Sequence, residues 1–159
     1  MENEKDLLYI LKYRNELNDI KEYTDLIFAY LNLEPIDILF RDIEQEGRYY
    51  IKENYIVVST KLAGSKVELL KTISHEARHY YQLVCVNQED NDDALVTIWR
   101  KELQAEVTEK TIQEEMCAAL ELDAYSFSKF ILKKLYNIKI EYSDLDYDDL
   151  VNWYINKFF

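Results

Sequence analysis

The chain carries one residue pattern suited to metal chemistry, the HExxH pattern at residues 75–79. Residues four positions apart lie on one face of an α-helix, so the imidazoles of His75 and His79 can bind one zinc ion at about 2.0–2.1 Å each. Glu76 lies beside that face, where its carboxylate can take a proton from a metal-bound water. Zinc lowers the pKa of such a water to about 7, so the pattern predicts hydrolysis at neutral pH.

Two further features favour this interpretation over two surface histidines on an amphipathic helix. The chain has only two histidines, and both fall inside HExxH. The pattern also lies well inside a helix that the sequence predicts from a capping box at Ser65 and Glu68 to about Val86.

A catalytic zinc needs a third protein ligand and an open position. No third histidine exists, so we expect a carboxylate or a thiolate from elsewhere in the chain. Glu121 is the best candidate because it shares a helix face with small residues, which would let its helix approach the metal closely, and Asp123 is the runner-up. The alternative is that Glu121 is a solvated helix charge. The acidic residues considered were Glu102, Glu106, Glu109, Glu114, Glu115, Glu121 and Asp123.

HExxH followed, after a long gap, by Glu-x-x-Ala-x-x-Phe at residues 121–127 resembles the gluzincin metallopeptidases. The order of helix, small sheet, HExxH helix and glutamate helix is similar to minigluzincins and to IrrE-type and phage-associated metallopeptidase domains, over about residues 36–136. The resemblance implies that His75, His79 and Glu121 bind Zn²⁺ and that Glu76 is the general base and acid. Larger gluzincins often place Asp where this chain has Tyr125, which leaves the carboxylate support of a ligand histidine unassigned.

Other groups could assist the reaction. An oxyanion needs a hydrogen-bond donor, and the candidates are Tyr125, Tyr136 and Arg78. Arg78 has an alternative role in a helix-surface salt bridge. An exposed sheet edge at residues 55–59 could hold an extended peptide by strand addition. Cys85 is not expected to be a nucleophile, because both histidines are used by the metal.

The composition restricts the partners. A formal net charge of −12 opposes binding to nucleic acids or anionic membranes, so we expect no direct contact with either. The first residues lack the basic start and apolar run of a secretory signal, and no apolar stretch approaches about 18 residues, so the sequence predicts a cytoplasmic protein.

With two glycines and one proline in 159 residues, few segments interrupt a helix. The sequence predicts an α+β fold, mostly helical, with a small three-stranded antiparallel sheet packed on the HExxH helix. One domain is expected, with a helical segment at 1–34, a metallopeptidase-like core at 36–136 and a helix at 144–159. Within these, we expect helices over 4–31 (two, meeting near 17–19), 65–86, a segment after 93, about 113–136 and 144–159, and strands within 36–43, 49–51 and 55–58.

The sequence thus predicts a zinc-dependent peptidase acting on a protein or peptide substrate. One alternative is a catalytically silent, acidic binding or inhibitor protein of phage or mobile-element type that keeps the fold. The intact HExxH pattern argues against this, since a mimic of nucleic acid needs no such spacing. A regulatory protease that cuts one repressor is a further alternative, suggested by the IrrE resemblance.

Overall fold

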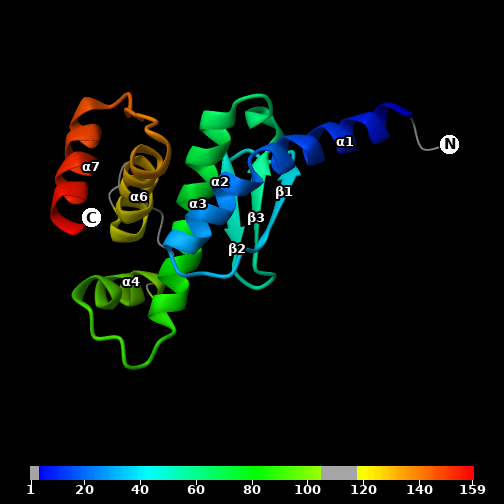
Figure 1. Cartoon of the computed structure of the whole chain (residues 1–159). Coiled ribbons are helices and arrows are strands. Elements are labelled where there is room, and N and C mark those ends of the chain that lie inside the picture. The colour runs from blue at the N-terminus through cyan, green and yellow to red at the C-terminus, as the bar shows by residue number, and fades with distance from the viewer. Residues whose placement is uncertain (1–3, 105–117) are drawn as a thin grey trace. The chain divides into compact units, whose positions relative to one another are not determined.

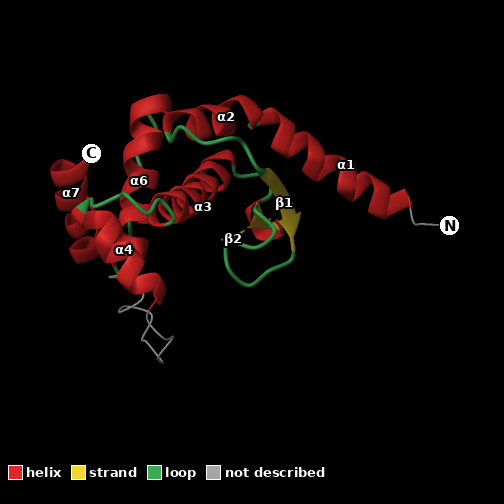
Figure 2. Cartoon of the chain, turned by 90° about the horizontal axis from the view of Figure 1, so that it is seen from below, coloured by secondary structure: helices red, strands yellow, loops and turns green. Residues whose placement is uncertain are grey.

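A computed structural model describes residues 4–104 and 118–159 of the chain (Figure 1). The described chain is mostly helical, with one small sheet, as the sequence predicted (Figure 2). It divides into two compact units, residues 1–76 and 77–159, and helix α3 contributes to both. The expected helix start near Gln113 lies outside the described residues, as do four of the acidic candidates: Glu106, Glu109, Glu114 and Glu115.

The first unit begins with two helices, α1 (Glu4–Asp19) and α2 (Lys21–Tyr30), which confirms the predicted break near residues 17–19. Helix α1 packs on the first strand, where the rings of Tyr13 and Phe40 lie 4.6 Å apart. Aromatic packing therefore holds α1 against the sheet.

The sheet contains β1 (Asp37–Arg41), β2 (Gly47–Tyr50) and β3 (Tyr55–Ser59) in the order β1-β3-β2, followed by the short 3-10 helix η1 (Thr60–Leu62). The β2–β3 pair is antiparallel as expected, but β1 runs parallel to β3, so the sheet is mixed.

The prediction of an all-antiparallel sheet was wrong in this respect, as was that of an exposed edge at residues 55–59. The reason is visible in the residues of β3: Ile56, Val57 and Val58 have no exposed surface. A continuous apolar run is typical of a strand covered on both faces, and such a strand takes the central place. The edge strands are β1 and β2.

Helix α3 (Lys66–Val86) starts where the sequence predicted, and the Ser65 hydroxyl accepts a hydrogen bond from the Glu68 amide at 3.4 Å. The Glu68 side chain does not complete the capping box but pairs with Lys71 at 2.8 Å. The sheet packs against α3. The buried side of the helix includes Leu70 and Ile73 in the first unit and Ala77 in the second.

The second unit adds α4 (Ala94–Gln104), α6 (Ala119–Tyr136) and α7 (Leu145–Phe158). Asp93 caps α4 by accepting from the amides of Leu95 and Val96, and Asp144 caps α7. The Glu102 carboxylate accepts from the amides of Ala119 and Leu120 at 2.7 and 3.0 Å. Glu102 therefore hydrogen-bonds the first backbone amides of α6, which have no partner within the helix, and is not a metal ligand.

Two apolar clusters hold the second unit together. One joins α6 to α7, and the other joins α3 to α4 through Cys85, Val96 and Trp99. The α6–α7 cluster comprises Leu122, Tyr147, Val151 and Tyr154. No helix within the described ranges is long and apolar enough to cross a membrane.

Candidate metal centre

His75 and His79 project from α3 one helical turn apart, and Glu121 lies in the first turn of α6. Each offers one ligand atom, and these three atoms all lie within 4.8 Å of one another. All three side chains are partly buried, so the group is neither sealed in the core nor spread over the surface. Two imidazoles and one carboxylate form one of the ligand sets that catalytic zinc sites use.

The separation between His79 and Glu121 fits a shared metal ion. His79 Nε2 and Glu121 Oε1 are 3.1 Å apart. Two ligand atoms of a tetrahedral zinc at bond lengths of about 2.0–2.1 Å are about 3.3 Å apart. The pair is therefore spaced as two corners of a zinc coordination shell are.

Gln82, one turn after His79, fixes the orientation of that imidazole. Its amide nitrogen donates to the carbonyl oxygen of Leu120 at 2.9 Å and to Asp123 Oδ2 at 2.7 Å. Both of those groups only accept, so the Gln82 oxygen must be the atom that faces His79 Nδ1, at 2.9 Å. His79 Nδ1 then donates to Gln82, and Nε2 is the ring nitrogen that lies on the side of Glu121.

Asp123 supports this arrangement from the core and is not a ligand of the candidate site. Its carboxylate has no exposed surface and accepts from Arg78 Nε at 2.7 Å and Nη2 at 3.1 Å. The Tyr154 hydroxyl donates to Asp123 Oδ1 at 3.1 Å. Burial, and then the charge of Asp123, raise the pKa of Tyr154, so that hydroxyl stays a neutral donor.

Arg78 is a buried partner of Asp123 and does not lie on the helix surface. Its guanidinium carbon lies 4.4 Å from the ring centroid of Tyr81 and 5.0 Å from that of Phe127. Only 7% of its surface is exposed. The role that Arg78 has in the structure is thus a bidentate ion pair within an aromatic shell, and its expected surface salt bridge is corrected to a core one.

The two tyrosine candidates for an oxyanion donor lie on α6, at different distances from Glu121. Tyr125 packs its ring edge-on against Tyr142 and Tyr147, at 5.5 and 5.8 Å between centroids. Tyr136 ends the helix, about 22 Å along its axis from Glu121 at 1.5 Å per residue. That distance rules out Tyr136 as a donor at this site.

Glu76 is held by the sheet. The Tyr49 amide of β2 donates to its Oε2 at 2.8 Å, and the side chain is 8% exposed. Gly47, two residues earlier, makes this approach possible, because a Cβ there would lie 2.4 Å from Thr72 Cγ2 and 3.2 Å from Glu76 Cγ. Gly47 lies within β2, and the packing of that strand on α3 requires its missing side chain.

Gly47→Ala should consequently push β2 away from α3 and disturb Glu76. We expect a loss of about 1–3 kcal/mol in the free energy of unfolding, the usual cost of overpacking. Urea denaturation of the variant measures this loss. Gly64→Ala is the comparison: a Cβ at Gly64 meets no atom within 4 Å, but φ is +89°, so any loss there comes from backbone strain and not from overpacking. If the Gly47→Ala variant has the same free energy of unfolding as the wild type, β2 does not pack this tightly on α3.

Gln82 and the Arg78–Asp123 pair are functional neighbours that the sequence analysis missed. The sequence could have indicated Gln82, because a polar residue three positions after a ligand histidine shares its helix face.

No family model, curated protein or solved structure matches the chain. The assignment of the site therefore rests on its geometry and on the HExxH pattern.

Proposed function

We propose that the chain is a zinc-dependent peptidase that hydrolyses peptide bonds in a protein or peptide substrate. The observation that carries the proposal is the group of His75, His79 and Glu121, whose ligand atoms lie within 4.8 Å of one another. Two imidazoles and one carboxylate leave a coordination position open, as catalytic zinc sites do and structural ones do not. Glu76 follows the first ligand directly and supplies the carboxylate that such hydrolysis needs.

Zinc in this position would act as a Lewis acid and lower the pKa of water to about 7. The chain's own residues would bind the ion and orient its ligands. Glu121 and the two histidines would hold the ion, and the Gln82 contact at Nδ1 orients the His79 imidazole so that Nε2 faces Glu121.

Glu76 is prepared for proton transfer by its asymmetric environment. The Tyr49 amide anchors Oε2, which leaves Oε1 as the oxygen that takes a proton from the attacking water. The same oxygen can return that proton to the leaving nitrogen, because the anchor holds the carboxylate in place between the two transfers.

The test is metal-dependent cleavage. The full chain is loaded with zinc and incubated with a complex mixture of peptides, and the products are identified by mass spectrometry. We expect new termini that disappear on chelation and return when zinc is restored. A protein that binds one zinc per chain but cuts nothing across such a mixture would contradict the proposal and favour the non-catalytic binding alternative.

A further inference from the structure

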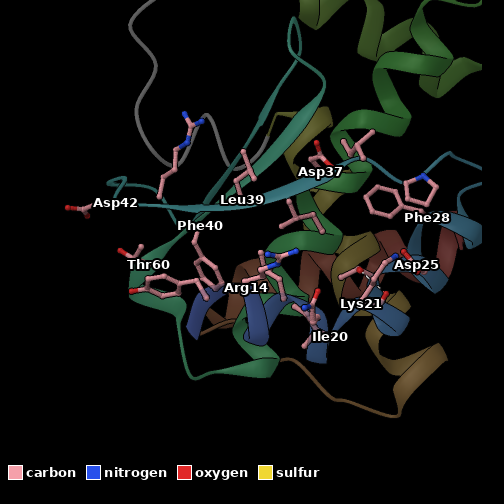
Figure 3. A pocket seen from close by; sticks show the side chains of 18 residues that line it. Arg14, Ile20, Lys21, Asp25, Phe28, Asp37, Leu39, Phe40, Asp42 and Thr60 are labelled. Atoms are coloured by element: carbon pink, nitrogen blue, oxygen red, sulfur yellow. Dashed lines mark hydrogen bonds and ion pairs between the residues drawn. The ribbon is translucent and has the colours of Figure 1, made fainter. Parts of the chain in front are cut away.

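The first unit contains a cavity of about 790 Å³ between helices α1 and α2 and strand β1 (Figure 3). Its volume lies within the range of about 300–1,000 Å³ that is usual for ligand sites. The residues that form the candidate metal centre do not line it. It is therefore a separate feature from that centre.

The lining of this cavity shows that it follows β1. All five residues of Asp37–Arg41 line it. The cavity therefore extends along the whole length of β1. One edge of β1 is paired with β3. The cavity thus lies beside an edge strand, and such a strand has backbone donors and acceptors that the sheet leaves unpaired.

The wall opposite β1 combines apolar surface with a basic side chain, Arg14. Ile20 and Phe28 are buried residues of this wall. Lys21 is neutralised by Asp25 at 2.6 Å, whereas Arg14 has no ion partner among the side chains of residues 12–104 and 118–159. Figure 3 shows Arg14 directed from α1 into the space below β1. An occupant with an acidic side chain at that point would complement it.

We propose that this groove binds an extended segment of a partner protein, which adds as a strand to β1 and places an acidic side chain near Arg14. Strand addition uses an open edge of the kind that β1 presents, and β1 spans about 17 Å at 3.3 Å per residue. The net charge of −12 makes two copies of this chain repel each other, which disfavours a second copy as the occupant. The inference does not depend on the proposed peptidase activity.

The probe is a fluorescent, acetylated hexapeptide of alternating valine and threonine in which the central valine is replaced by aspartate. Its first control carries lysine in place of the aspartate. Two further controls are N-methylated on alternate amides, at odd or at even positions. Amides of alternate residues point to the same side of a strand, so only one of the two methylated peptides should lose binding.

Binding is measured on the full chain by fluorescence anisotropy, with peptide integrity checked by mass spectrometry. We expect the aspartate peptide to bind more tightly than the lysine peptide, and Arg14→Glu to weaken it about fivefold, as for a reversed surface ion pair. Arg48→Glu, an exposed arginine on the other edge strand, is the matched control and should change little. Hydrogen exchange should slow in residues 37–41.

Three results would overturn the inference. The first is absence of binding by either unmethylated peptide. The second is protection of Gly47–Tyr50 in β2 instead of β1. The third is a dimer in light scattering whose formation protects residues 37–41, since the groove would then serve a second copy of the chain.

Discussion

Asp123→Ala should lower the free energy of unfolding by about 3–5 kcal/mol, the cost of leaving one member of a buried ion pair without its partner. Asp123 is fully buried, and Arg78 would remain in an aromatic shell with its charge uncompensated. The substitution also removes an acceptor of Gln82 and of Tyr154. Urea denaturation in the presence of a chelator measures the effect without a contribution from metal.

Glu121→Ala, two positions away on the same helix, is the matched control for this experiment. Its side chain is 34% exposed, so the metal-free protein should keep its stability within about 0.5 kcal/mol. Glu121→Ala should instead weaken zinc binding far more than Asp123→Ala does. In the folded molecules of Asp123→Ala, the loss of an outer partner should lower zinc affinity by about 10–100-fold. If Asp123→Ala unfolds at the same urea concentration as wild type, the buried ion pair does not support the fold.

A double substitution separates the charge effect from simple loss of packing. Arg78→Met with Asp123→Leu replaces both partners by apolar groups of similar size, which is often neutral or stabilising for a buried pair. We expect the double variant to be more stable than Asp123→Ala. A double variant at least as unstable as the single one would mean that the hydrogen bonds to Gln82 and Tyr154, and not the charge of Arg78, dominate.

Glu76→Gln should leave zinc bound and the fold intact but reduce hydrolysis by about 10²–10⁴-fold, the usual contribution of a general acid–base group. The amide cannot take up the proton that the carboxylate accepts. It retains an oxygen that can accept from the Tyr49 amide, so the contact between β2 and α3 persists. Cleavage rates of wild type and variant, both at one zinc per chain, give the comparison.

Thermal unfolding shows whether Glu76→Gln changes the fold as well as the reaction. Thermal unfolding of Glu76→Gln should match that of wild type within a few degrees, because the packing around the side chain is unchanged. An unaltered cleavage rate in the zinc-loaded variant would exclude Glu76 as the base. A lost metal would instead indicate that Glu76 supports the histidines directly.

Local patterns in the sequence predicted most of the helices correctly. Ser65, Asp93 and Asp144 act as caps near the expected starts, because a capping side chain interacts with backbone only two or three residues away. HExxH placed both histidines on one face for the same reason. Glu121 was reached by combining small neighbouring residues with the resemblance to gluzincins, and the structure brings it within reach of the same ion.

The features that the sequence did not predict depend on contacts between distant residues. The pairing of β1 with β3 joins residues that flank β2 in the chain, whereas the sequence had predicted an antiparallel sheet with an exposed edge at residues 55–59. Asp123 was the second candidate for the third ligand because nothing near it in sequence shows that Arg78, 45 positions earlier, lies against it. Burial alone distinguishes it from Glu121, and burial is a property of the folded chain.

The central claim is that His75, His79 and Glu121 bind one metal ion, and metal analysis of the purified chain tests it most directly. After saturation with zinc and removal of free ion, elemental analysis should give about one zinc per wild-type chain and far less for His79→Ala and Glu121→Ala, each confirmed to be folded by circular dichroism. The account is contradicted if wild type retains no zinc, or if both variants keep one zinc per chain.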